Sequence, residues 1–290
     1  MNKIKTKVNK DTNYVFHMLS AARCGYDNFY GERYRSLHKA ADLNILKKYE
    51  ELITVRGGEH CGELYSLLVA VPACGECSAK EYYANILAQF QKEPVPDLVK
   101  EYMEFKAPAT EIAAVMAENY GIYEAVWEKS EKELLEYAKQ VEERFTDSGF
   151  TDKCEKLVGQ ELKAEYFHAA FTNSVAWGPE AIDISEEQDM FGIDRTVEDA
   201  FYFIGHEFII YLLMEALKDT NAFQSFEAWP LTEGLAEFYL TEVMGNSRFF
   251  DEQLRYAEFY RERFAENPAL SAKELFLLAK EKLCGKVPVE

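Results

Sequence analysis

The sequence predicts a mainly helical α+β fold. Only 15 glycines and 8 prolines interrupt its 290 residues, which favours long helices over a many-stranded sheet. Hydrophobic residues make up 48% of the chain and aromatic residues 14%, enough to fill a packed core. The last part of residues 175–185 alternates apolar and polar side chains, which is the period of a half-buried strand. We therefore expect many helices and a small amount of sheet.

The first half, residues 1–150, is predicted to be a helical region. Apolar residues from Tyr14 to Ala22 recur at roughly helical spacing before a break at residues 24–28. Further helices are expected over residues 34–49, 80–91, 95–105, 109–128 and 131–144, and residues 64–71 could form either a strand or a short buried helix. The run Thr-Asp-Ser-Gly at residues 146–149 is typical of a helix end and marks the predicted boundary between two halves.

The second half, residues 151–290, is expected to contain further helices besides the strand. Helices are predicted over residues 161–171, 197–218, 230–244 and 251–266. Ser271, followed three residues later by Glu274, forms a capping-box pattern that predicts the start of a last helix.

Charge and hydropathy restrict the expected partners and location. The formal net charge of −19 repels phosphate backbones and anionic lipid, so we expect neither nucleic acid nor a membrane surface as partner. The most apolar stretch, residues 201–217, carries His206, Glu207 and Glu215, which indicates a buried helix rather than a membrane span. The N-terminal residues lack the apolar core of a signal peptide. We therefore expect a cytoplasmic location, where the six cysteines would be mostly free thiols.

The residues that carry chemistry lie on two helices of the second half. An imidazole and a carboxylate, His206 and Glu207, stand together in an otherwise apolar run and would be costly to bury without partners. The next helix opens with Trp-Pro and places Glu233 one turn before Glu237. Gly and Ala near Glu233 would allow another helix to approach closely. A metal ion is one candidate partner for these side chains.

This pattern resembles that of the gluzincin metallopeptidases, the thermolysin- and aminopeptidase-like zincins. These proteins carry His-Glu-x-x-His on one helix and Glu-Gly-x-Ala on a second, and the matching segments cover roughly residues 170–245. The resemblance implies that His206 is the first zinc ligand, Glu207 the general base and Glu233 the third ligand. It further implies a zincin-like domain over residues 151–290, with the strand ending at Ser185 as the edge that pairs with substrate backbone.

The chain departs from the motif at one ligand. The second histidine of His-Glu-x-x-His is replaced by Ile210, which cannot bind a metal. A catalytic zinc normally has three protein ligands, so two alone should bind zinc weakly. Glu237, one turn beyond Glu233, and His168, ahead of the predicted strand, are the candidates for a substitute ligand.

Two functions follow as hypotheses. The first is a metallopeptidase homologue with an incomplete zinc site, weakly active or inactive, that acts in binding or regulation of a peptide or protein segment. The alternative is an active zinc peptidase that recruits Glu237 or His168 as a ligand, with Glu207 as general base.

A separate cluster offers a different metal site. His60 and Cys61 precede Cys74 and Cys77, and the last two form a Cys-x-x-Cys pair. Thiolates and an imidazole suit zinc, but a structural zinc motif normally has two such pairs. A third hypothesis is therefore that this loop holds the only metal of the protein.

Overall fold

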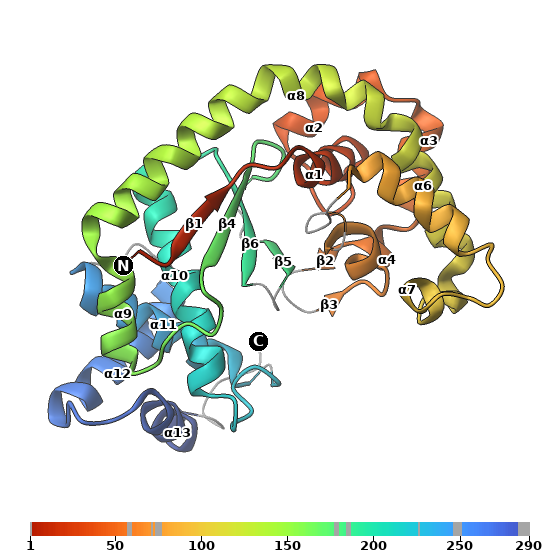
Figure 1. Ribbon diagram of the computed structural model, residues 1–290. Helices are drawn as coiled ribbons and strands as arrows, with labels where there is room; N and C mark the ends of the chain where they lie inside the picture. Colours follow the sequence, from red (N-terminus) through yellow and green to blue (C-terminus); the bar gives the residue numbers. More distant parts are fainter. Residues whose placement is uncertain are drawn as a thin grey trace. The chain divides into compact units, whose positions relative to one another are not determined.

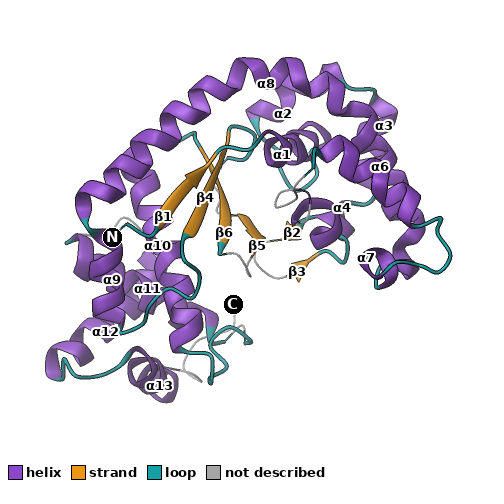
Figure 2. Ribbon diagram, in the orientation of Figure 1, coloured by secondary structure: helices purple, strands orange, loops and turns teal. Residues whose placement is uncertain are grey.

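The computed structural model confirms the predicted fold class. Helices make up 68% of the chain, and a small mixed sheet accompanies them (Figures 1 and 2). The structure describes residues 2–56, 60–70, 72, 77–176, 180–183, 187–225, 227–245 and 251–283.

The chain folds into two compact units. The first comprises Met1–Lys5, Gln140–His168 and Val197–Glu290, and the second comprises Thr6–Lys139 and Ala169–Thr196. The division falls within helix α8 and within strands β1 and β4, so it does not coincide with the ends of elements. The predicted domain boundary near residue 150 stays a prediction.

The second unit contains the N-terminal helices and most of the sheet. Its helical elements are α1 (Lys10–Ala22), α2 (Phe29–Tyr34), η1 (Arg35–Leu37), α3 (Ala40–Lys48), α4 (Glu50–Ile53), η2 (Ser66–Ala70), α6 (Ala79–Gln89), α7 (Asp97–Lys100), η3 (Met103–Phe105) and most of α8 (Lys106–Ser148). Residues 66–70, for which strand and helix were both open, are helical. Helix α1 begins where the Asn9 side chain accepts hydrogen bonds from two backbone N–H groups, and it ends at Arg23 in the left-handed region.

The sheet has the strand order β1-β4-β6-β5, and a separate pair joins β2 (Val55–Arg56) to β3 (His60–Cys61). The four strands are β1 (Ile4–Lys7), β4 (Phe167–Thr172), β6 (Gln188–Gly192) and β5 (Glu180–Asp183). The predicted strand is found as β5, antiparallel to β6 and at one edge of the sheet. The other three strands of this sheet were not predicted.

The prediction of a helix over residues 161–171 is wrong. Helix α9 (Phe150–Val158) ends at Gly159, whose φ of 75° is in the left-handed region, and the chain then enters β4. In β4 the ring of Phe167 packs against Phe208 and Tyr211 of helix α10. The local sequence is compatible with both a helix and a strand. Pairing with neighbouring strands, together with this packing, stabilises the strand.

Helix α8 is continuous over the two helices predicted at residues 109–128 and 131–144. Figure 1 shows it as one long helix. The junction contains Ser130, whose hydroxyl donates a hydrogen bond to the carbonyl of Val126 at 3.2 Å. Because this bond stays within the helix, the serine does not interrupt it.

The first unit contains the helices that carry the candidate site. These are α9, α10 (Val197–Ala216), α11 (Trp229–Met244), α12 (Asp251–Glu266) and α13 (Ala272–Leu283). Helix α11 packs against α10 and α12. The predicted capping box before α13 is confirmed, since Ser271 and Glu274 exchange side chain–backbone hydrogen bonds. All three helices predicted over residues 197–266 are present within a few residues of their expected ends.

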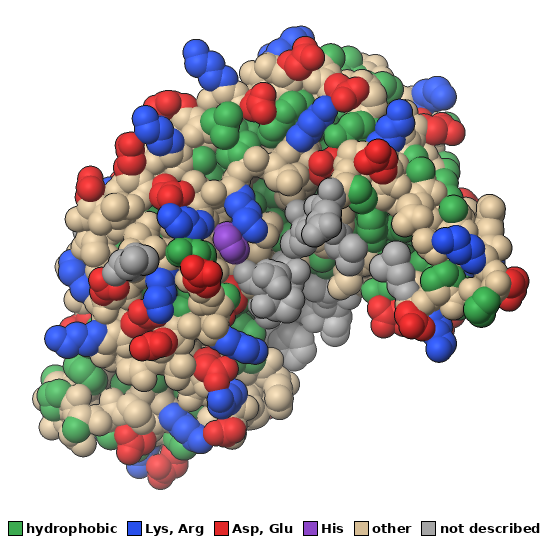
Figure 3. Space-filling view, in the orientation of Figure 1, with side chains coloured by type: hydrophobic (Ala, Val, Ile, Leu, Met, Phe, Trp, Pro, Cys, Tyr) green, Lys and Arg blue, Asp and Glu red, His purple; other side chains and the backbone are tan. Residues whose placement is uncertain are grey.

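The surface carries mixed charges. Figure 3 shows Lys and Arg side chains interspersed among Asp and Glu on the visible face, with no single-sign patch there. In the part of the chain that the structure describes, no helix is both long and apolar enough to cross a membrane.

The close contact between α11 and α12 depends on Gly234. A Cβ atom at this position would lie 2.2 Å from the Cβ of Tyr256 on α12. We expect Gly234→Ala to force the helices apart and to lower the free energy of unfolding by about 1–3 kcal/mol, measured by urea denaturation. The control is Gly121→Ala on α8, where a Cβ meets nothing within 4 Å. That variant should be neutral or slightly more stable. Equal stabilities for the two variants would contradict this account of the interface.

Candidate functional site

His206 and Glu233 meet between helices α10 and α11. Nε2 of His206 lies 3.0 Å from Oε2 of Glu233, within hydrogen-bonding distance. His206 is buried on α10, and Pro230 in the first turn of α11 sets the start of the helix that carries Glu233. The structure therefore brings together the two residues that the sequence pattern pairs as metal ligands.

Glu237 lies on the other side of the same imidazole. Its Oε2 is 4.0 Å from Nδ1 of His206, and its side chain is fully buried. Oε1 of Glu237 accepts a hydrogen bond from the hydroxyl of Thr241 at 3.4 Å. Nδ1 and Nε2 flank the same ring carbon but point in divergent directions, so Glu237 does not face the Nε2 side where a shared ligand would lie. At 4.0 Å this carboxylate is too far from Nδ1 for a hydrogen bond, and it acts on the imidazole through its charge.

This arrangement shifts two pKa values. Burial lowers the pKa of His206, but the hydrogen bond that its ring donates to Glu233 and the charges of Glu233, Glu207 and Glu237 outweigh burial, so the pKa is raised. Burial raises the pKa of Glu207 to about 7, with an opposing contribution from His206 and a supporting one from Glu233. A carboxyl group with a pKa near neutrality can both accept and release a proton at physiological pH.

Ile210 occupies the helix position one turn after His206. Its side chain is buried and offers no donor atom. The donors that face each other are thus one imidazole nitrogen and one carboxylate, which do not complete the three-ligand set of a catalytic zinc. Within the described ranges, no three His, Cys, Asp or Glu side chains are grouped so as to hold a metal ion.

The orientation of His168 does not favour it as a substitute ligand. The residue is half-buried on β4, next to Phe167. Phe167 points toward α10, where its ring centroid is 5.4 Å from that of Tyr211. Because consecutive side chains of a strand point to opposite faces, His168 points away from the face that packs on α10.

The strand predicted to pair with a substrate is at the edge of the sheet, but its outer side is already occupied at one point. Ile182 on β5 is buried, and the carbonyl of Ala181 accepts a hydrogen bond from the hydroxyl of Tyr65. A peptide that paired along β5 at this residue would have to displace that hydroxyl. Ser185, where the strand was expected to end, lies outside the described residues.

The Cys/His loop is only partly described. His60 and Cys61 lie on β3, where His60 is opposite Arg56 and Cys61 opposite Val55. Cys77 is an exposed free thiol, and Cys74 lies outside the described residues. The hypothesis of a metal in this loop stays a prediction.

Comparison with protein-family models, with curated proteins and with solved structures yields no match for this chain. The resemblance to gluzincins therefore rests on the residues of α10 and α11 and on their geometry. The sequence did not predict that Glu237 lies on the Nδ1 side of His206. The signal for this position was the spacing of Glu233 and Glu237, one turn apart on the same helix.

Proposed function

We propose that this chain is a gluzincin-like metallopeptidase homologue with an incomplete zinc site, which binds a peptide or protein segment without hydrolysing it. The observation that carries the proposal is the 3.0 Å approach of His206 Nε2 to Glu233 Oε2, with Ile210 in place of the second histidine ligand. The hydrogen bond gives Nε2 of the buried imidazole and one oxygen of the Glu233 carboxylate a partner without a metal.

The surroundings of this pair support a structural role for it. His206 has a carboxylate at each edge of its ring, Glu233 near Nε2 and Glu237 near Nδ1, and all three side chains join α10 to α11. A buried polar cluster of this kind stabilises one arrangement of two apolar helices when its members are satisfied. Such a cluster can persist after hydrolytic activity is lost, because it holds the helices together independently of chemistry.

The proposed ligand is a peptide because the sheet has an edge strand, β5, and because the resembling proteins bind peptides at such an edge. Pairing of a peptide with Ala181 would displace the Tyr65 hydroxyl from its carbonyl. Zinc, if it were held, would rest on His206 and Glu233, with Glu207 as the neighbouring proton acceptor. Two donors are too few to position it, so no hydrolytic step is proposed.

The test measures zinc content, hydrolysis and binding on the same purified protein. We expect zinc well below one ion per chain, fluorescently labelled casein peptides that bind, and recovery of those peptides uncut by mass spectrometry. His206→Ala should leave the zinc content unchanged.

Near-stoichiometric zinc that is lost in His206→Ala would instead support a substitute ligand. Hydrolysis abolished by a chelator and by Glu207→Gln would then establish the alternative, an active zinc peptidase. Absence of both binding and cleavage would contradict each of the two functions.

A further inference from the structure

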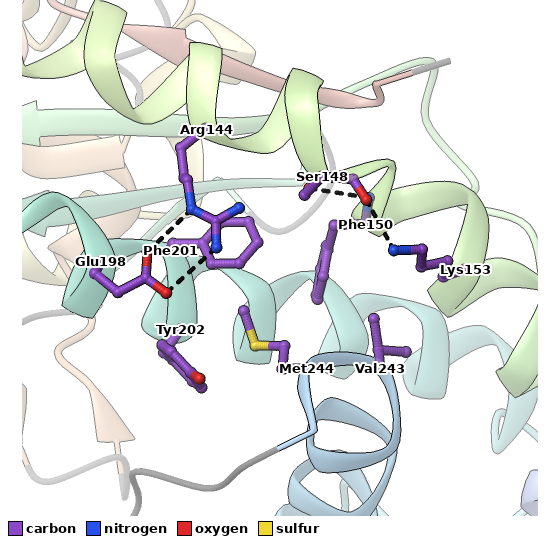
Figure 4. Close-up of a pocket in the computed structure, with 9 residues that line it drawn as sticks. All are labelled: Arg144, Ser148, Phe150, Lys153, Glu198, Phe201, Tyr202, Val243 and Met244. Carbon is purple, nitrogen blue, oxygen red and sulfur yellow. Dashed lines mark hydrogen bonds and ion pairs between the residues drawn. The ribbon is translucent and has the colours of Figure 1, made fainter.

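A second candidate site lies in the first unit and is lined by residues other than His206, Glu207, Glu233 and Glu237. A cavity of about 390 Å³ is formed where the ends of α8, α9, α10 and α11 come together (Figure 4). It is lined by Arg144, Ser148, Phe150, Lys153, Glu198, Phe201, Tyr202, Val243 and Met244. We propose that this cavity binds a small molecule that joins one anionic group to an aromatic body.

Arg144 provides a cation in a fixed position. Its Nε lies 3.0 Å from Oε2 of Glu198 and its Nη2 lies 3.3 Å from Oε1, a bidentate pair. The guanidinium carbon is 3.9 Å from the centroid of the Phe201 ring. These contacts hold the guanidinium in place but leave Nη1 without a partner among the described residues. Arg144 therefore keeps donors for a ligand and loses little side-chain entropy on binding it.

Lys153 provides the second cation. Its Nζ donates to the carbonyl of Ser148 at the end of α8, at 2.9 Å, and an ammonium group has three donors in all. Among the described residues it forms no ion pair, so its charge is not neutralised by a neighbouring carboxylate. The cavity is thus lined by two cations and by one carboxylate, Glu198, on a chain whose net charge is −19. Local charge therefore favours an anionic ligand despite the overall charge of the protein.

The remaining lining is aromatic and apolar. Phe150 and Phe201 are buried, with ring centroids 5.5 Å apart, and Tyr202, Val243 and Met244 complete the lining. Figure 4 shows Phe150 and Met244 between the Arg144 side and the Lys153 side of the cavity. Pockets of 300–1,000 Å³ with apolar walls and a few polar groups are typical of small-molecule sites. Because Phe150 is 1% exposed and Phe201 3% exposed, an aromatic ring of the ligand would pack on the half-buried Val243 and Met244. Its anionic group would then reach Arg144 Nη1 or Lys153 Nζ.

The experiment uses 3-phenylpropionate as probe, with 3-phenylpropionamide and 3-phenylpropylamine as neutral and cationic analogues. Binding is followed by NMR in ¹³C-methyl methionine protein, because Met244 lines the cavity and reports on it directly. We expect the anion to shift the Met244 methyl resonance and to bind about tenfold or more tightly than the amide, since charge-assisted hydrogen bonds are about twice as strong as neutral ones. The amine should bind more weakly still.

Matched variants on α9 separate this site from a general attraction of anions. Lys153→Gln should weaken binding of the anion several-fold to about tenfold, whereas Lys156→Gln removes the same charge from an exposed position outside the cavity and should not. Circular dichroism checks that both variants fold. The proposal is overturned if the three probes bind alike, if none shifts Met244 at millimolar concentration, or if both lysine variants behave the same. None of these outcomes depends on zinc or on hydrolysis.

Discussion

Ile210→His is expected to convert the His206–Glu233 pair into a zinc site. Residues four apart share one face of a helix, so the new imidazole would project beside that of His206 toward Glu233. Structural sites with four ligands bind zinc with a free energy of about 10–16 kcal/mol, or roughly 3 kcal/mol per ligand. One added ligand should therefore raise zinc affinity by about 100-fold or more.

The same substitution should destabilise the metal-free protein. Ile210 is 6% exposed in an apolar helix, and an imidazole buried there without a partner costs about 1–3 kcal/mol. Zinc would restore this loss by supplying the partner. The melting temperature of Ile210→His should thus fall without metal and rise on addition of zinc, while that of the parent protein responds little.

Two controls give this experiment its specificity. Ile209→His buries the same imidazole on a neighbouring position of α10 that is rotated by about 100° away, so it should destabilise without gaining zinc. The double variant Ile210→His/His206→Ala should lose the gain. If Ile210→His binds zinc no better than Ile209→His, then α10 and α11 do not have the geometry of a zincin site.

The helix pair that carries the site could be predicted from the sequence because its signals are local. Helix α10 is a long apolar run with one polar interruption, and α11 opens with a proline in its first turn. The meeting of His206 and Glu233 followed from the motif. The rotation of the imidazole did not, since no spacing rule says which ring nitrogen faces which carboxylate, and this rotation separates the place of Glu237 from that of Glu233.

The features that could not be predicted depend on contacts between distant segments. Strand β4 pairs with β1, which lies near the N-terminus, and residues 161–171 carry no local signal of that pairing. Strand β6 carries only weak alternation and was missed for the same reason.

A buried pair of histidines also depends on contacts between segments that are distant in the sequence. Nε2 of His17 on α1 lies 2.9 Å from Nε2 of His38, and both residues are buried. At the outer nitrogens, Nδ1 of His17 is 2.8 Å from the hydroxyl of Tyr30, and Nδ1 of His38 is 2.8 Å from Oδ1 of Asn119. Nδ2 of Asn119 donates to Asp42.

These contacts assign one direction to the whole chain of hydrogen bonds. Because Asn119 donates through Nδ2, its Oδ1 accepts from Nδ1 of His38. Nε2 of His38 then accepts from Nε2 of His17, whose Nδ1 accepts from the Tyr30 hydroxyl. Both imidazoles are neutral in this arrangement. A proton added to Nε2 of His38 would place two N–H groups against each other.

The protein is therefore expected to lose stability as the pH falls below about 6.5, the ordinary pKa of histidine. Burial, together with the charge of His38, lowers the pKa of His17 to about 3 in the folded protein. Burial also lowers the pKa of His38, against opposing contributions from Asn119 and Asp42. Between about pH 3 and pH 6.5, the unfolded chain therefore binds a proton at His17 that the folded chain does not bind. The titration of His17 alone should then lower the free energy of unfolding by about 1.4 kcal/mol for each pH unit of acidification, or by about 2 kcal/mol from pH 6.5 to pH 5.

Urea unfolding at several pH values measures this loss, and a double variant separates it from the titration of the many carboxylates. His17→Gln/His38→Gln removes both imidazoles and should flatten the pH dependence between pH 6.5 and 5. The ¹⁵N chemical shifts of His17 provide a test that needs no variant. They should remain those of a neutral ring with an unprotonated Nδ1 at pH 5, and a protonated His17 ring in the folded protein at that pH would refute the assigned network.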